Sequence, residues 1–401
     1  MNSLISPDEA NARIRANLGS ISAIAYPLGM CAGRILRQDV RADRPFPPFD
    51  RSMMDGFALR AAEIGEDGRF EITLQVPAGS AQATLGATPG SCAEIMTGAA
   101  VPEHADCVVP YEATERLNDA QMRLLNPTAH RSGDCIHPLG SDIGQGDVLL
   151  RPGTRLGGRE TAVAASCGYA ELQVAELPRI AVISTGDELV DVSSQPAPHQ
   201  IRRSNDLAIE TSLTRAQLSA QTRAHLPDDP TTSYERLKAL IEQNRILIIS
   251  GGISMGKKDF IPDALNALGL TCHFHGVAQK PGKPMGFWSH AECAVFALPG
   301  NPSSTLSCLH YYAIPAILDA MGLTQHEPPR RVTLDREVKA RDDLTVFLPV
   351  ELLADNRAKP QPTQNSGDLV RILSSDGFVK LPPAKEKSYT AGKSFDFYLW
   401  H

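Results

Sequence analysis

The chain has 401 residues, a formal net charge of −7, 42% hydrophobic and 21% charged residues, which is typical of a soluble globular protein with several domains. With no long run of one charge we do not expect a general nucleic-acid binder, and with no signal peptide and no run of about eighteen apolar residues we expect neither export nor a membrane span. The eight cysteines are scattered without a Cys-x-x-Cys pair, so we expect buried thiols and a reducing compartment, the cytoplasm.

The N-terminal segment carries a helix start. Ser6 can cap the helix, Pro7 suits its first position, and Glu9 can complete a capping box with Ser6. The apolar residues that follow at helical spacing define one face: Ala10, Ile14 and Leu18. Residues 44–60 contain several prolines, so we expect an irregular loop that ends in a turn into a strand.

Short strands and many turns dominate residues 70–169. Apolar and β-branched runs predict strands at Ala93–Thr97, Cys107–Tyr111, Gln121–Leu125 and Asp147–Leu150. We therefore expect a mainly β region with little helix.

Strands and helices alternate from residue 177 onward. The predicted strands are Ile180–Ser184, Thr222–Leu226, Ile246–Ser250, Thr271–Val277, Met285–Trp288 and Ala294–Leu298. The predicted helices are Asn205–Ala220, Tyr234–Asn244, Ile261–Leu268 and Ser304–Met321. This alternation is typical of a doubly wound, mostly parallel α/β sheet.

A Glu-Pro-Pro linker signal at residues 327–329 precedes the last part of the chain. There, alternation predicts strands at Arg331–Val338, Leu344–Leu352, Leu369–Leu373, Gly377–Leu381 and Ser394–Leu399. A small β barrel or sandwich is the expected fold.

The segment at residues 246–260, ILIISGGISMGKKDF, joins an apolar strand to a glycine pair. Ligands bind at the carboxyl ends of parallel strands, and glycine lets backbone N–H groups approach an anion closely. Ser250 and Ser254 add hydroxyls, and Asp259 adds a carboxylate. An ordinary tight turn between strand and helix is the alternative.

Three further loops follow strands of the same predicted sheet, so we expect them at the same edge: residues 184–188, 280–284 and 299–302. Their glycines, hydroxyls and two lysines suit phosphates, and their acids, with Asp259, suit a hard cation such as Mg²⁺. Together these groups favour phosphoryl or nucleotidyl chemistry. The alternatives are helix capping by the acids, solvated lysines and a merely rigid proline turn.

Six motifs in this order resemble those of the molybdopterin molybdenumtransferase family, the bacterial MoeA proteins, whose relatives include the E domain of gephyrin. The motifs are PPFDRSMMDGFA at 47–58, IMTGAAVP at 95–102, ISTGDEL at 183–189, SGGISMGKKDF at 250–260, KPGKP at 280–284 and LPGNP at 298–302. The resemblance spans almost the whole chain.

The resemblance implies a multidomain α/β plus β fold of four parts. These are an elongated N-terminal linker region of helix and strand at residues 1–45 and 140–176, an inserted β domain at 46–139, a central MogA-like doubly wound α/β domain at 177–326, and a small C-terminal β barrel at 327–401. The implied reaction inserts molybdate into adenylated molybdopterin and releases AMP, with Mg²⁺. The implied partners are a second copy that shares the active site and, transiently, the molybdopterin adenylyltransferase and molybdoenzyme assembly factors.

The resemblance also implies roles for individual residues. The catalytic set is Asp55, Thr97, Asp187, Glu188 and Asp259, of which Asp187, Glu188 and Asp259 are the implied metal ligands. The residues implied to bind the pterin phosphate and nucleotide are Ser250, Gly251, Gly252, Ser254, Lys280, Lys283, Pro299, Gly300, Asn301 and Ser366. A further family acid matches either Asp228 or Asp229.

Three positions depart from the family pattern. Met53 replaces a smaller residue that is usual there. Gly276 stands where a basic residue is common, and His275 is a possible substitute for it. Arg341 matches a family arginine, but two aspartates follow it where an aromatic residue is expected nearby.

Two other functions remain as alternatives. A MogA-like molybdopterin adenylyltransferase would need only the α/β domain, whereas the motifs at 47–58 and 95–102 favour molybdate insertion. A gephyrin-like scaffold would bind receptor peptides, but the chain lacks the long linker and extra domain of such scaffolds.

Overall fold

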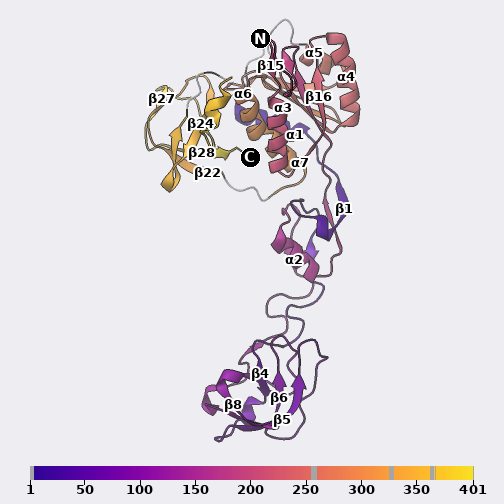
Figure 1. The fold of residues 1–401 in the computed structure, drawn as a ribbon, viewed down its shortest axis with the longest axis vertical. Coiled ribbons are helices and arrows are strands. Elements are labelled where there is room, and N and C mark those ends of the chain that lie inside the picture. Colours follow the sequence, from indigo (N-terminus) through magenta and orange to yellow (C-terminus); the bar gives the residue numbers. More distant parts are fainter. Residues whose placement is uncertain (1–3, 254–259, 325–328, 362–364, 366, 401) are drawn as a thin grey trace. The chain divides into compact units, whose positions relative to one another are not determined.

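The computed structural model describes residues 4–253, 260–324, 329–361, 365 and 367–400. Contacts divide the chain into two compact units, and both are drawn in Figure 1. The large unit comprises Met1–Gln38, Pro152–Gly158 and Glu171–His401, and the small unit comprises Asp39–Arg151 and Arg159–Ala170. The finer division into four parts stays a prediction.

A six-stranded sheet forms the core of the small unit, in the order β7-β4-β6-β5-β9-β8. Its strands are β4 (Gly56–Leu59), β5 (Arg69–Val76), β6 (Ser91–Ile95), β7 (Cys107–Pro110), β8 (Thr114–Asn118) and β9 (Gln121–Leu124). Phe57 and Leu59 enter one core cluster and Ala58 enters another, because successive side chains of β4 point to opposite faces. The expected mainly β region is therefore confirmed.

Shorter elements complete the small unit. Two antiparallel pairs are β2 (Val40–Arg41) with β11 (Val148–Leu150) and β3 (Arg51–Ser52) with β10 (Ile136–His137). The helical turns are η2 (Ala61–Glu63), η3 (Tyr111–Ala113) and η4 (Pro127–Ala129), and the helix α2 spans Gly158–Ser166.

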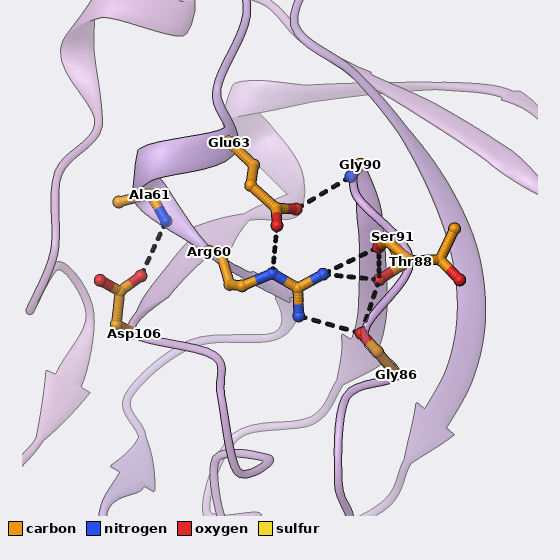
Figure 2. Close-up of polar contacts among 8 residues, drawn as sticks. All are labelled: Arg60, Ala61, Glu63, Gly86, Thr88, Gly90, Ser91 and Asp106. Atoms are coloured by element: carbon orange, nitrogen blue, oxygen red, sulfur yellow. Dashed lines mark hydrogen bonds and ion pairs between the residues drawn. The ribbon is translucent and has the colours of Figure 1, made fainter.

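The Arg60 side chain, just after β4, forms hydrogen bonds with the loop at residues 86–90 of the small unit (Figure 2). Its Nε–H donates to Glu63 Oε1 at 2.5 Å, and its other N–H groups donate to the carbonyl oxygens of Gly86 at 3.0 Å and Thr88 at 2.8 Å. Glu63 Oε2 accepts the Gly90 N–H at 2.8 Å. The hydrogen bond from Arg60 holds the pKa of Glu63 below its ordinary value. One ion pair thus holds both ends of residues 86–90.

Replacing Arg60 with Met is expected to destabilise the small unit by about 2 kcal/mol, because its hydrogen bonds are lost and the partly buried Glu63 carboxylate loses its cation. Amide hydrogen exchange of β4 and β6 reports on this unit separately. Arg69→Met is the matched control, since the Arg69 side chain is exposed on β5. Unchanged exchange protection in Arg60→Met would contradict the prediction.

A six-stranded sheet also forms the centre of the large unit, in the order β16-β13-β17-β21-β20-β18. Its strands are β13 (Ile180–Thr185), β16 (Ala220–Leu226), β17 (Ile246–Ser250), β18 (Thr271–His275), β20 (Gly286–Ser289) and β21 (Ala294–Leu298). The first four in spatial order are parallel, and β20 pairs antiparallel with both β21 and β18. The apolar strand predicted at 246–250 is therefore a central, buried parallel strand.

Helices cover both faces of this sheet. One face packs against α3 (Asn205–Arg215) and the helical stretch at residues 302–320, and the other packs against α4 (Pro230–Gln243) and α5 (Ile261–Ala267). The predicted doubly wound domain is thus confirmed. No helix within the described ranges is both long and apolar enough to cross a membrane.

The helix predicted over Ser304–Met321 is interrupted. It consists of α6 (Pro302–Cys308), the π-helical segment η5 (Leu309–Ala313) and α7 (Ile314–Ala320). Pro315 lacks the N–H that would donate to the carbonyl of Tyr311, and a wider turn accommodates that loss.

The N-terminal helix α1 (Pro7–Asn17) is as predicted, with one difference. Ser6 Oγ accepts the Glu9 N–H at 3.1 Å, whereas the Glu9 carboxylate pairs with Arg13 at 2.5 Å and does not close a capping box. The predicted face is buried: Ala10, Ile14 and Leu18. Two short strand pairs of this unit are β1 (Ala23–Pro27) with β12 (Glu171–Ala175) and β14 (Leu189–Val190) with β15 (Ile201–Arg202), and η1 spans Leu28–Met30.

The predicted C-terminal barrel is confirmed, and five strands close it, including an unpredicted strand at Arg357–Pro360. In ring order they are β24 (Thr345–Leu352), β25 (Arg357–Pro360), β22 (Arg330–Leu334), β28 (Ser394–Leu399) and β26 (Gly377–Leu381), which pairs again with β24. A separate pair consists of β23 (Val338–Lys339) and β27 (Ser388–Tyr389), and η6 spans Ala354–Asn356.

The strand predicted at Leu369–Leu373 is wrong, because this segment contains the short helix α8 (Leu369–Ile372). Asp368 Oδ1 accepts the Arg371 N–H at 3.3 Å and caps the turn. Ile372 is buried, but Val370 and Leu373 are 76% and 86% exposed, so the apolar letters do not mark a strand with one buried face.

A two-residue strand joins the α/β part to the barrel. β19 (Gln279–Lys280) pairs in parallel with β24. The buried Tyr312 hydroxyl donates to Gln279 Oε1, and Gln279 Nε2–H donates to the Gly282 carbonyl at 3.2 Å. A buried side-chain network and a barrel strand therefore hold the start of the KPGKP segment.

Candidate active site

A cavity of about 620 Å³ lies in the large unit, at the carboxyl ends of its parallel strands. Small-molecule sites span roughly 300–1,000 Å³, so a nucleotide-sized ligand fits. The lining residues are 184–186, 188–189, 201–205, 228, 250–253, 260, 284, 299–302 and 367. The loops that the strand order placed at one edge, those after β13, β17 and β21, do meet there.

Two glycines bring the loop after β17 against the end of β13. Gly251 and Gly252 have φ angles of +97° and +68°, which non-glycine residues rarely adopt. A Cβ would lie 2.6 Å from Thr185 Oγ1 at Gly251 and 2.8 Å from Ile261 Cγ1 at Gly252. Only glycine fits this close approach. The N–H of Gly251 donates to Leu298 O at 3.0 Å, so this N–H is already paired within the protein.

The turn after β21 lies against the same glycine loop. A Cβ at Gly300 would be 3.4 Å from the Gly251 Cα, so a side chain at position 300 would be in van der Waals contact with the glycine loop. Asn301 caps α6 without a side-chain hydrogen bond to that helix, and it lines the cavity beside Pro299. The buried Thr305 hydroxyl donates to Pro299 O at 2.6 Å and holds the turn from behind.

The start of α3 supplies a residue that sequence reasoning did not single out. Asn205 Nδ2 lies 2.9 Å from Ser250 Oγ, 2.7 Å from Gly300 O and 3.1 Å from Thr305 Oγ1. One amide thus contacts the end of β17, the turn after β21 and the helix α6. Its position directly after Ser204, at a predicted helix start, was the available signal, but such a position is also typical of ordinary capping.

Carboxylates occupy another part of the cavity wall. Glu188 and Asp228 line it, whereas Asp187 Oδ1 accepts the Asp228 N–H at 3.1 Å. Gly186 has a φ of +120°, and a Cβ there would lie 2.4 Å from Glu188 Oε2, so glycine lets this carboxylate lie against the backbone. Among the described residues, no three His, Cys, Asp or Glu side chains form a cluster that could hold a metal by themselves.

The two candidates for the further family acid have different positions. Asp228 lines the cavity. Asp229 Oδ1 instead accepts the Thr232 N–H at 2.8 Å and caps α4, and Thr232 holds the pKa of Asp229 below its ordinary value. Geometry therefore favours Asp228 as the site residue.

The predicted phosphate lysines do not line the described part of the cavity. Lys280 and Lys283 are exposed, and Lys280 belongs to the strand β19 that pairs with the barrel. Among the described residues, the basic side chains that line the cavity are Arg202 and Arg203, and Arg203 pairs with Asp191 at 3.0 Å. The predicted lysines stand next to a glycine turn in the sequence, and these two arginines do not.

In the small unit, Asp55 and Thr97 form one contact, although 42 positions separate them. The backbone N–H of Thr97 donates to Asp55 Oδ1 at 2.6 Å, and its hydroxyl donates to the same oxygen at 2.8 Å. The backbone donor first and the hydroxyl second hold the pKa of Asp55 below its ordinary value of 3.8. The two motifs therefore form a single preorganised carboxylate at the surface.

The low pKa of Asp55 predicts a pH dependence with a definite sign. Because the folded pKa lies below 3.8, the contact stabilises the fold above pH 3.8 and loses that effect as the pH falls through the folded value. We expect Asp55→Ala to melt at a lower temperature than the wild type at pH 7, and the difference to shrink below pH 3.8. A difference that grows toward low pH would contradict this sign.

Three predicted site residues lie outside the described residues: Ser254, Asp259 and Ser366. Gly367, next to Ser366, lines the cavity. His275, considered as a substitute at the Gly276 position, contacts Ile253 O through Nε2 at 2.7 Å and so supports the end of the glycine loop. Arg341 forms a surface ion pair with Asp343 at 2.7 Å.

Comparison with known proteins adds three family matches along the chain. The MoeA N-terminal region (domain I and II) matches residues 5–168, a probable molybdopterin binding domain matches residues 181–319, and the MoeA C-terminal region (domain IV) matches residues 331–400.

Curated relatives and a solved structure resemble the chain over nearly its full length. Proteins named molybdopterin molybdenumtransferase from Synechocystis sp. and Bacillus subtilis are 40% and 30% identical to it over 375 and 379 residues, covering 92% and 91% of this chain and 93% and 87% of theirs. The crystal structure of a molybdopterin biosynthesis MoeA protein from Pyrococcus horikosii superimposes with a TM-score of 0.83 at 29% identity, covering 100% of both chains.

Proposed function

The chain belongs to the MoeA family, and on this premise we propose that it is a molybdopterin molybdenumtransferase. Its substrates are molybdate and adenylated molybdopterin, and its products are molybdenum cofactor and AMP. The observation that carries the proposal is the cavity, in which a glycine loop suited to phosphate lies in the same space as carboxylates suited to a cation.

The chain's own groups account for the binding half of this activity. The proposed donors for phosphate oxygens are the backbone N–H groups of Gly252 and Ile253 and the hydroxyl of Ser250, which all belong to residues that line the cavity. Arg202, at the end of β15, adds positive charge to the cavity wall, and the neighbouring Arg203 is paired with Asp191. No side-chain nucleophile is needed, because an oxygen of molybdate or water can attack the phosphorus as the phosphoanhydride breaks.

The donor set also fits Mg²⁺, which prefers oxygen ligands and keeps some of its water. Glu188 and Asp228 would hold the ion from the cavity wall, with Asp187 beside Asp228 and Asp259 as a further proposed ligand. When bound, Mg²⁺ would offset negative charge on the pyrophosphate oxygens.

The test is to mix the pure protein with adenylated molybdopterin, Mg²⁺ and molybdate, and to measure AMP release and the formation of active cofactor. Molybdate-stimulated AMP release supports the proposal, and its absence would overturn it. A parallel reaction with ATP and unmodified molybdopterin tests the adenylyltransferase alternative. Adenylate formation in that reaction, without molybdate-dependent turnover, would favour the alternative.

We further propose a homodimer in which Asp55 and Thr97 of one copy complete the cavity of the other. The basis is the family resemblance together with the preorganised Asp55 carboxylate, which is exposed. If the site is shared, mixing inactive Asp55→Ala with an inactive cavity variant restores activity in the mixed dimer. Lack of rescue, or a purely monomeric protein in sedimentation, would contradict the shared site.

A further inference from the structure

Hydrogen-bond accounting around Asn205 determines which way the nearby protons point. Gly300 O can only accept, so the Asn205 amide nitrogen, at 2.7 Å, donates to it. Thr305 Oγ1–H donates to a backbone carbonyl, Pro299 O at 2.6 Å or Asn301 O at 3.2 Å, so the Thr305 oxygen is an acceptor for its other neighbours. The second N–H of Asn205 is then directed at Ser250 Oγ, 2.9 Å away, and at Thr305 Oγ1, 3.1 Å away.

This arrangement leaves the hydroxyl proton of Ser250 available. Because Ser250 Oγ accepts from Asn205, its own proton is not needed for that contact. Among the described residues, the other side-chain partner of this hydroxyl is Thr305 Oγ1 at 3.3 Å, which is longer than the usual O–H···O distance of about 2.7–2.8 Å. Ser250 lines the cavity together with Asn205.

We propose that Asn205 is a positioning residue, which holds the Ser250 hydroxyl as a hydrogen-bond donor to the phosphate of a nucleotide bound in the cavity. The inference rests on the proposed function, which supplies the nucleotide. Asn205 also donates to Gly300 O, so it fixes the distance between the Ser250 hydroxyl and the turn after β21. The buried Thr305 hydroxyl completes the arrangement from the side away from the ligand.

The experiment is a double-mutant cycle with the full-length protein, measured by calorimetric titration with AMP and with adenosine. Ser250→Ala is expected to weaken AMP binding roughly tenfold, because a hydrogen bond to a charged oxygen is lost, and to leave adenosine binding nearly unchanged. Asn205→Ala is expected to weaken AMP binding by a similar factor. The double variant should bind AMP no more weakly than Ser250→Ala.

Alanine is preferred to aspartate at position 205, because a new carboxylate would repel phosphate whatever the role of Ser250. The matched control is Asn17→Ala, since the exposed Asn17 side-chain amide donates to the Arg13 carbonyl of its own helix, away from the cavity lining. Asn205→Ser provides a second variant if Asn205→Ala does not fold.

The outcomes separate this inference from the proposed function. Three outcomes would overturn the positioning role and leave the proposed function intact. They are a loss of AMP affinity in the double variant equal to the product of the two single losses, unchanged AMP affinity in Asn205→Ala, or a loss of adenosine affinity as large as that for AMP. A wild-type protein that binds neither AMP nor adenosine would overturn the nucleotide site, and the inference with it.

Discussion

Glu188→Gln is expected to slow molybdate-dependent AMP release by about a hundredfold, which is the scale for loss of a group that holds or supports a metal. The amide keeps the shape of the side chain but removes one of the two carboxylates that the described residues contribute to the cavity wall. Because the loss is one of cation affinity, raising the Mg²⁺ concentration should recover part of the rate. The measurement is the initial rate of AMP release over a range of Mg²⁺ concentrations.

The matched control for this prediction is Glu242→Gln, an exposed glutamate on α4. Its rate and its Mg²⁺ dependence should equal those of the wild type. If Glu188→Gln retains the wild-type rate at every Mg²⁺ concentration, Glu188 does not take part in metal binding.

Gly251→Ala is expected to destabilise the large unit by about 3 kcal/mol and to abolish AMP binding. Alanine would have to adopt a φ of +97° with its Cβ 2.6 Å from Thr185 Oγ1 and 3.3 Å from the Thr185 carbonyl oxygen. Either the loop moves away from β13 or β13 shifts, and both changes alter the floor of the cavity. Chemical denaturation followed by tryptophan fluorescence measures the stability, because Trp288 and Trp400 both belong to this unit.

Gly269→Ala separates backbone strain from crowding. Gly269 has a φ of +83°, and a Cβ at this position would have no neighbour within 4 Å, so its substitution should cost only about 1 kcal/mol and leave AMP binding unchanged. Equal effects of the two substitutions would show that contact with Thr185 is unimportant.

Local sequence patterns correctly predicted the elements that depend on residues only a few positions apart. The cap at Ser6, the buried face of α1 and the apolar strand β17 all follow from residues a few positions apart. The meeting of the loops after β13, β17 and β21 was also predictable, because parallel strands present their carboxyl ends at one edge.

Other features depend on contacts between distant segments. Lys280 lies in a segment whose composition suits phosphate, but pairing with a barrel strand far later in the chain removes it from the described cavity lining. Asn205 stands at a sequence position typical of an ordinary helix start. Its hydrogen-bond partners are 45 to 100 positions away in the sequence, so a local pattern could not indicate them. The segment Leu369–Leu373 alternates too briefly to tell a strand from one helical turn.

The short strand β19 has a consequence for dissecting the protein. A fragment that ends before β22 would lack β24, and the edge of Gln279–Lys280 would lose its partner. The same cut would uncover the rings of Tyr311 and Tyr312, which contact Phe347 of the barrel at centroid distances of 4.8 and 6.5 Å. The α/β part expressed alone would therefore expose an aromatic surface beside an unpaired strand edge, and we expect it to aggregate. Aggregation of this fragment would not be evidence against the activity of the intact chain.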